Sequence, residues 1–213
     1  MEVEIFVVDN HSQDDSLDYL IPQFPEVRFI ANTKNVGFAR ANNQAIEQST
    51  GKYVLLLNPD TVIAENTLYE VFQFMEAHPE AGGAGVKMLD GDGRFLPESK
   101  RGFPTPWVSF CKIFGLSALF PHSRIFGHYH MKYLSPDECH PIDILSGAFM
   151  FMRRETLDKS GLLDESFFMY GEDIDLSSAR PCRIHQLFPA DSYYTLQRRE
   201  HEERKPAIRP CLL

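Results

Sequence analysis

The sequence is poor in cysteine and has no long apolar run. Its four cysteines are scattered without a CxxC pair, which argues against a zinc site or a disulfide framework and is typical of a reducing compartment. The longest apolar runs, at residues 54–57 and 148–152, fall far short of the roughly 18 residues of a membrane-spanning helix. No basic segment precedes an apolar one at the N-terminus, so no signal peptide is expected.

Basic charge is also scarce. The 213 residues include 21 Lys and Arg against 30 Asp and Glu, a net charge of −9, whereas a general nucleic-acid binder needs a basic face. The length and the 43% of hydrophobic residues suit one globular domain. The charge is uneven, because the residues from Arg180 onward hold seven basic and four acidic side chains in an otherwise acidic chain.

Predicted strands and helices alternate over the first 90 residues. This alternation predicts an α/β fold with a mostly parallel sheet. Ligands of such sheets bind at the carboxyl ends of the strands, where Asp9 and Asp60 are expected to lie. The predicted strands are residues 4–9, 27–30, 52–57 and 85–89, and the predicted helices are residues 16–24, 37–48 and 66–78.

Residues 94–141 interrupt the alternation and are rich in proline and aromatic side chains. They predict loops with one or two short helices, in a lid or an acceptor-binding segment. Trp107, with Phe103 and Phe110, could form a platform for a sugar or a separate hydrophobic cluster. The alternation then resumes, with a strand at residues 146–152, a helix at residues 153–159 and a helix that begins near residue 171.

Polar clusters follow several of the predicted strands. A carboxylate such as Asp9 can accept hydrogen bonds from a nucleobase or a ribose, and Asp60 can hold Mg²⁺ or Mn²⁺ against a diphosphate. A glycine that opens a helix, here Gly37, lets a phosphate approach, and Arg40 could pair with that phosphate. Each cluster also has an ordinary structural explanation, as a helix N-terminus, a loop–helix junction or an Asx turn.

A further acidic cluster lies at residues 172–175. Three carboxylates at the start of a helix are favourable for the helix dipole. They also repel one another, and this repulsion would raise the pKa of one of them and suit a general base that deprotonates a hydroxyl. Both interpretations remain open from the residues alone.

Taken in order, these clusters resemble a family 2 glycosyltransferase of the GT-A fold. The resemblance is greatest to the rhamnosyltransferase-type branch of bacterial enzymes that build cell-surface polysaccharide. It covers residues 2–177, and its linked motifs are specific as a set. The matching segments are residues 7–12, 35–39, 58–60, 145–148 and 163–176.

The resemblance implies an inverting transfer of a sugar from a nucleotide-diphosphate-sugar donor to a glycan or lipid-linked acceptor. It also implies a divalent cation, Mg²⁺ or Mn²⁺, at Asp60, and a cytoplasmic location with peripheral association at the inner face of the plasma membrane. Asp173 would be the base, and Glu172 would orient the acceptor. The implied nucleotide-sugar contacts are Asp9, Asn10, Ser12, Asn35, Gly37, Arg40, Asn58 and Asp60, and the acceptor side would include Gly147, Ala148 and Trp107.

The chain departs from the family pattern at both ends. The opening βα unit of the family has no counterpart, and the pattern stops after residue 178. Back-translation of the tail in a shifted frame recovers the family's expected His-Tyr-Lys-Gly-Glu-Ser segment. We therefore expect a glycosyltransferase domain at residues 1–178 and an out-of-frame tail at residues 179–213, with low or absent activity. The alternatives are a nucleotide-binding module without turnover and a gene fragment without function.

Overall fold

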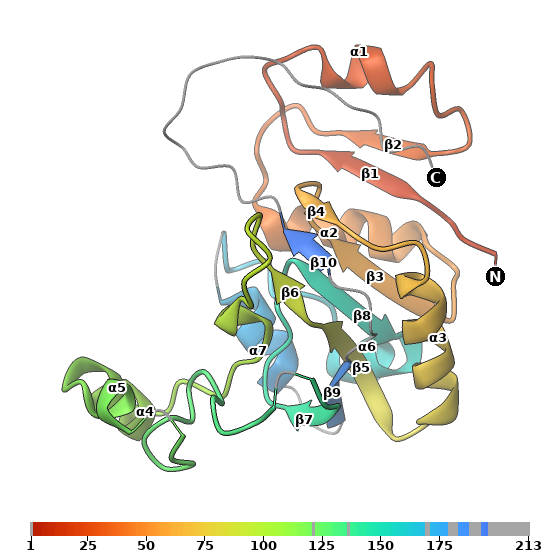
Figure 1. Ribbon diagram of the computed structural model, residues 1–213. Coiled ribbons are helices and arrows are strands. Elements are labelled where there is room, and N and C mark those ends of the chain that lie inside the picture. Colours follow the sequence, from red (N-terminus) through yellow and green to blue (C-terminus); the bar gives the residue numbers. More distant parts are fainter. Residues whose placement is uncertain are drawn as a thin grey trace.

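A computed structural model of the chain describes residues 2–120, 122–135, 137–168, 171–178, 183–187 and 193–195. Helices and strands alternate along the first half of the chain, as expected (Figure 1). No helix within these described ranges is both long and apolar enough to cross a bilayer.

The strands are β1 (Phe6–Asp9), β2 (Arg28–Ala31), β3 (Tyr53–Leu57), β4 (Thr61–Val62), β5 (Ala81–Val86), β6 (Met88–Leu89), β7 (His140–Ile142), β8 (Phe149–Arg153), β9 (Arg183–Leu187) and β10 (Tyr193–Thr195). The helices are α1 (Ser16–Leu20), α2 (Phe38–Gln48), α3 (Thr67–Ala77), the 3-10 turn η1 (Pro97–Ser99), α4 (Pro106–Ile113), α5 (Leu116–Leu119), α6 (Arg154–Ser160) and α7 (Glu172–Ser178).

The main sheet has five strands in the order β3-β8-β5-β9-β7. β8 is antiparallel to both β3 and β5, β9 is parallel to β5, and β7 is antiparallel to β9. The sheet is therefore mixed rather than mostly parallel, because β8 follows the long irregular segment instead of a helical crossover. Its register places Leu57 opposite Phe149, which brings the end of β3 beside the start of β8.

Two smaller sheets lie beside the main one. β1 and β2 pair in parallel, with Val7 opposite Phe29. Among the described strands, neither β1 nor β2 is hydrogen-bonded to the five-stranded sheet, and Figure 1 shows the pair beyond β3 and α2. β10 joins β4 and β6 in a third sheet. The strand that ends at Asp9 is thus held to the main body through side chains and α2 rather than through a strand ladder.

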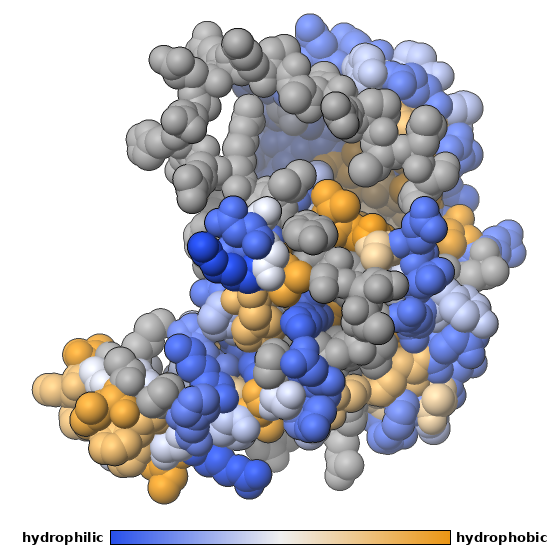
Figure 2. All heavy atoms as spheres, in the orientation of Figure 1, coloured by the Kyte–Doolittle hydropathy of each residue, from blue (hydrophilic) through white to orange (hydrophobic). Residues whose placement is uncertain are grey.

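The helices α4 and α5 project from the body of the molecule (Figure 1). Figure 2 shows hydrophobic side chains gathered over this projection, in contrast to the mostly hydrophilic surface beside it. Ile113 at the end of α4 is 79% exposed, and Leu119 at the end of α5 is 69% exposed. Of the one or two short helices expected in residues 94–141, two are present, with an apolar and exposed surface.

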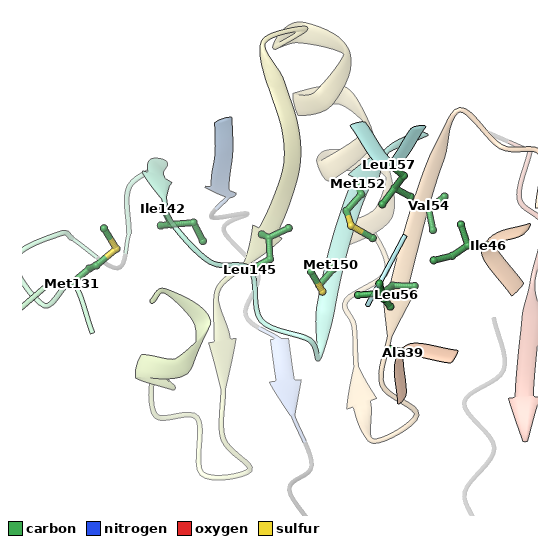
Figure 3. Close-up of a cluster of buried hydrophobic side chains, with 11 residues drawn as sticks. Ala39, Ile46, Val54, Leu56, Met131, Ile142, Leu145, Met150, Met152 and Leu157 are labelled. Atoms are coloured by element: carbon green, nitrogen blue, oxygen red, sulfur yellow. The ribbon is translucent and has the colours of Figure 1, made fainter. Parts of the chain in front are cut away.

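The hydrophobic core lies on both faces of the main sheet. Alternate side chains of β3 and β8 point to opposite faces, as the period of a strand requires. On one face α2 and α6 pack on the sheet (Figure 3), and on the other face α3 packs on β5 and β8. The first cluster is Ala39, Ile46, Val54, Leu56, Met131, Ile142, Leu145, Met150, Met152, Leu157 and Leu163, and the second is Val71, Met75, Ala81, Ala84, Val86, Met88, Phe149 and Phe151.

The strand expected at residues 85–89 is longer and divided. β5 begins at Ala81, and every residue of β5 is buried. A Cβ atom added at Gly83 or Gly85 would lie 3.1 or 3.0 Å from the Leu145 side chain, so these glycines allow a close approach rather than a turn. In the segment expected to be an out-of-frame tail, the structure describes β9 and β10, and the other residues of 179–213 lie outside the described residues.

Candidate active site

The loops after β1 and β2 are joined by one side chain, that of Asn10. Its Nδ2 donates to Asn35 Oδ1 over 2.8 Å, and its Oδ1 accepts the Val36 N–H over 2.9 Å. The Asp9 carboxylate accepts the Ser12 N–H, with 3.2 Å to each oxygen. The structure therefore brings Asn10 against Asn35 and Asp9 against Ser12, four of the residues that the resemblance assigns to the nucleotide-sugar, from two loops about 25 residues apart.

Gly37 stands at the start of α2, where the chain meets the segment before α7. Its φ of +88° lies in the region that favours glycine, and a Cβ added there would be 2.8 Å from the Phe168 carbonyl oxygen. The Phe38 N–H donates to the same oxygen over 3.1 Å. The first turn of α2 therefore packs on the segment that leads to the acidic cluster, and Arg40 lies 3.9 Å from Glu165 of that segment.

Asn43 makes a second connection between these regions, and the sequence analysis missed it. It is 4% exposed, its Nδ2 donates to the Leu163 carbonyl over 2.8 Å, and its Oδ1 accepts the Leu163 N–H over 3.1 Å. A buried amide that satisfies both groups of one distant residue fixes the position of that residue. The available signal was an asparagine between Ala39 and Ile46, on the buried side of α2.

The end of β3 contacts the start of β8 directly. The Asn58 N–H donates to the Ala148 carbonyl over 3.1 Å, so the expected diphosphate and acceptor segments are adjacent. Asp60 follows in the same turn, with an exposed side chain. No group of three metal-ligating side chains occurs in the described part of the chain. A single exposed carboxylate still fits Mg²⁺ or Mn²⁺, since such ions take their other oxygen ligands from substrate phosphates and water.

The acidic helix start places its carboxylates in different surroundings. Glu172 is 7% exposed, and its Oε2 has no hydrogen-bond partner among the described residues. Asp173 forms an ion pair with Arg101, and its Oδ1 accepts the Ile174 N–H over 2.8 Å. Arg101 is a second residue that the sequence analysis missed, because no local pattern marks its pairing across 72 residues.

Arg101 is held by the strand-like segment that precedes β8. The Ile144 N–H donates to the Arg101 carbonyl over 3.1 Å, and Arg101 Nη2 donates to the Leu145 carbonyl over 3.3 Å. Residues 144–148 thus contact Arg101, the partner of Asp173, at one end, and Asn58 at the other. The neighbouring Lys100 is 2% exposed and donates to the Leu134 carbonyl over 2.6 Å, and burial lowers the pKa of its ammonium group.

Trp107, expected on the acceptor side, lies apart from these contacts. It is on α4, 51% exposed, and its ring stacks on Phe110 with centroids 5.6 Å apart. It also lies 6.2 Å from the ring of Phe126. These contacts match the hydrophobic-cluster alternative, while a role toward the acceptor stays a prediction.

Comparison with known proteins identifies the family. The family Glycosyl transferase family 2 matches residues 1–161 of the chain. The chain belongs to glycosyltransferase family 2. The resemblance to this family is thereby confirmed, whereas the activity of the chain and the role of each site residue stay predictions.

The curated relatives include a rhamnosyltransferase, as the resemblance implied. The N-acetylglucosaminyl-diphospho-decaprenol L-rhamnosyltransferase of Mycobacterium tuberculosis is 28% identical over 185 residues, which are 82% of this chain and 59% of the relative. The low-salt glycan biosynthesis hexosyltransferase Agl10 of Haloferax volcanii is 27% identical, over 81% of this chain and 51% of its own. This family 2 chain therefore spans little more than half the length of these relatives.

Solved structures confirm the GT-A type of α/β fold. GalNAc-T7, crystallised with UDP, GalNAc and Mn²⁺, superposes with a TM-score of 0.62 at 14% identity, over 92% of this chain and 38% of its own. Residues 1–349 of Staphylococcus aureus TarS in complex with UDP superpose with a TM-score of 0.57 at 21% identity, over 91% of this chain and 51% of theirs. These two likenesses concern the fold alone.

Proposed function

We propose that this family 2 domain transfers a sugar, with inversion, from a nucleotide-diphosphate-sugar to a glycan or lipid-linked acceptor in cell-surface polysaccharide synthesis. The observation that carries the proposal is the continuous set of contacts from Asn58 through Ala148 to Arg101 and Asp173. The turn proposed to bind the diphosphate and the carboxylate proposed as the base thus contact the two ends of one short segment. The relatives that act on a lipid-linked sugar and in glycan biosynthesis support the acceptor class.

In the proposed reaction the acceptor hydroxyl oxygen attacks the anomeric carbon on the side opposite the leaving nucleoside diphosphate. The bond between that carbon and the diphosphate oxygen breaks, and its electron pair remains on the oxygen. The hydroxyl proton passes to the Asp173 carboxylate, which holds Arg101 through one oxygen and has lone pairs left to accept it. Glu172 stands beside it and would orient the acceptor.

Asp60 is the residue proposed to hold a divalent cation, with Asn58 in the same turn. When bound, Mg²⁺ or Mn²⁺ would neutralise charge on the departing diphosphate. The loops of Asp9 and Asn35 would bind the nucleoside, and Gly37 leaves the start of α2 open to a phosphate. Two of the solved structures with this fold contain UDP, and one of them also contains Mn²⁺, which supports this assignment.

The proposed location is the cytoplasm at the inner face of the plasma membrane, where a lipid-linked acceptor and a nucleotide-sugar donor meet. Peripheral association is the mode proposed. The chain is expected to bind nucleotide but to transfer sugar slowly or not at all.

Nucleotide binding without turnover is a second candidate, favoured by a specific observation. In the described residues the β1–β2 pair shares no strand ladder with the main sheet, so Asp9 is positioned relative to Asp173 mainly through Asn10 and α2. Catalysis is sensitive to a misplacement of about 1 Å between reacting groups, whereas binding tolerates more. A chain of this kind would bind a nucleoside diphosphate in the presence of Mn²⁺ and form little product.

The test is calorimetric titration of the full chain with UDP and with other nucleoside diphosphates, with and without Mn²⁺, followed by a transfer assay. Asp60→Asn should abolish the Mn²⁺-dependent part of binding. Asp173→Asn should keep nucleotide binding and lower turnover by a factor of about 10² or more. Asp158→Asn, an exposed change on α6, is the control and should alter neither. A nucleotide affinity that changes neither with Mn²⁺ nor with Asp60→Asn would count against the proposed donor site.

A further inference from the structure

The projection formed by α4 and α5 has the most exposed apolar surface of the described chain. We propose that this projection inserts into the surface of an anionic lipid bilayer and presents a membrane-held acceptor to Asp173. Its apolar side chains come from both helices and from the turn that follows them. They are Trp107 at 51%, Phe110 at 43%, Ile113 at 79%, Phe114 at 67%, Leu119 at 69%, Phe120 at 49% and Ile125 at 62% exposure.

A contiguous exposed apolar patch marks a surface that is covered by a partner or a membrane. The rings of Trp107 and Phe110 on α4 stack with centroids 5.6 Å apart, and the ring of Phe114, directly after α4, is tilted against Phe110 with centroids 4.4 Å apart. Tryptophan and phenylalanine on a short helix are typical of segments that lie in the bilayer interface rather than across it.

The charge around this patch indicates which partner covers it. The chain carries 30 acidic residues, yet none lies between Ser99 and Ser135. The same segment has basic residues, among them Arg124 and Lys132, whose side chains are exposed. An acidic protein would be repelled by an anionic bilayer except at such a surface. An anionic lipid surface complements these cations, whereas a symmetric dimer through this patch would place the cations of the two copies against each other.

The base of the projection is fixed to the proposed site. The chain leaves at Arg101, the partner of Asp173, and the next residue, Gly102, donates its N–H to the Tyr129 carbonyl over 2.9 Å. A Cβ added at Gly102 would be 2.5 Å from the His128 carbonyl, so the two ends of the excursion are in close contact. His128 Nε2 in turn lies 3.2 Å from Asp143 Oδ2. These contacts thus link α4 and α5, where the lipid-held acceptor would bind, to Arg101, the partner of the Asp173 carboxylate.

This inference rests on the proposed lipid-linked acceptor, but its test needs neither donor nor acceptor. The full chain is mixed with vesicles of phosphatidylcholine alone, or of phosphatidylcholine with phosphatidylglycerol, and the bound fraction is measured by co-sedimentation. Trp107 is the single tryptophan of the chain, so its fluorescence reports this surface directly. Binding is expected to the anionic vesicles, with a blue shift of the Trp107 emission and a loss of binding at high salt.

Matched variants separate this surface from general adsorption. Ile113→Asp with Phe114→Asp should lower the partition coefficient at least about tenfold, because two side chains no longer leave water. Tyr69→Asp, which alters a residue on α3 that is 60% exposed, should leave it within about twofold. Arg124→Glu should lower the partition coefficient about fivefold or more, and Lys159→Glu on α6 should lower it less.

The thermal transition of each variant should match that of the parent chain, since every altered side chain is exposed. The proposal is overturned by the absence of binding to anionic vesicles, by an unshifted Trp107 emission, or by equal losses in the α4 and α3 variants. A concentration-dependent dimer that Ile113→Asp with Phe114→Asp abolishes, without vesicle binding, would assign the patch to a second copy instead. Vesicle binding without transfer in any donor assay would retain this inference and remove the proposed reaction.

Discussion

Arg101 and Asp173 form an ion pair that joins the segment before α4 to the first turn of α7. Both side chains are mostly buried, at 17% and 14% exposure, and Arg101 also donates to the Leu145 carbonyl. The pair therefore fixes one oxygen of the carboxylate that we propose as the base. It also links that carboxylate to residues 144–148, which reach Asn58 at the end of β3.

Replacement of Arg101 by methionine should lower the free energy of unfolding by about 2 kcal/mol, because a mostly buried carboxylate loses its partner. Urea denaturation measures this change. Arg94→Met is the matched control, since Arg94 pairs with Asp92 on the surface, at 78% and 61% exposure, and should cost less than about 0.5 kcal/mol. If the two variants lost stability equally, the Arg101 pair would have no special structural role.

The same pair makes a prediction about turnover that a purely structural role would not. Arg101→Lys keeps a cation but replaces the planar guanidinium, whose Nη2 donates to both Asp173 and the Leu145 carbonyl, with a flexible ammonium group. It should lower kcat more than it changes KM for the donor, and a double-mutant cycle with Asp173→Asn should show coupling. Independent effects of the two changes would contradict the positioning of Asp173 by Arg101.

Asn43 supports the loop before α7 through two hydrogen bonds to Leu163. Asn43→Ala should cost about 2–3 kcal/mol of stability, since it leaves a buried N–H and a buried carbonyl without partners. Asn42→Ala is the control from the same helix, because Asn42 only bonds the Phe38 carbonyl one turn earlier and alanine favours a helix. Urea denaturation of the two variants should therefore differ by at least about 2 kcal/mol.

Gly37→Ala tests the contact between α2 and the segment before α7. Alanine at φ +88° is strained, and its Cβ would meet the Phe168 carbonyl at 2.8 Å. Gly161 has a similar φ of +91° with nothing within 4 Å of an added Cβ, so Gly161→Ala carries the strain without the clash. Gly37→Ala should thus be the more destabilising by about 1–2 kcal/mol and should weaken nucleotide binding, which Gly161→Ala should leave unchanged.

Much of the fold could be predicted from periodicity. Helix α2 and helix α3 were expected to within a residue at each end, because their apolar residues recur at helical spacing. The family motifs predicted the two loops that Asn10 joins. The order of the strands could not be predicted, because β8 enters the sheet between β3 and β5 through contacts that are distant in sequence.

The residues that contact the site from distant parts of the chain could not be predicted from the sequence either. Arg101 lies 72 residues from Asp173, and Asn43 lies 120 residues from Leu163. An arginine in an irregular segment and an asparagine inside a helix both have common surface explanations. Their importance depends on burial, which is set by packing rather than by the neighbours in sequence.

Lys100 predicts a pH dependence of stability. Burial lowers the pKa of its ammonium below the ordinary 10.5, so the unfolded chain binds this proton more tightly than the folded chain does. Stability contributed by this site therefore rises as the pH increases from the lowered pKa toward 10.5. The difference in unfolding free energy between the parent chain and Lys100→Met should grow in favour of the parent over this interval. A constant difference across the alkaline range would contradict the lowered pKa.

We expect that the reading frame of the gene is shifted near the codon for Ser178. β9 lies between β5 and β7 in the main sheet, and β5 is buried along its whole length. A strand at such a position is ordinarily a continuous apolar run, whereas Arg183–Leu187 contains Arg, His and Gln among its five residues. The shifted frame reads Gly-Tyr-Thr-Asn-Tyr at these five positions, which removes the arginine and places tyrosine, a residue enriched in strands, at two of them.

Resequencing of the gene around codon 178 should accordingly reveal a one-base insertion or deletion. The chain from the repaired frame should then unfold at a higher temperature, because its β9 would suit an interior strand better. The comparison with the unrepaired chain is matched, since residues up to 178 are identical in both. A confirmed DNA frame, together with equal unfolding temperatures of the two chains, would show that this polar β9 is native to the protein.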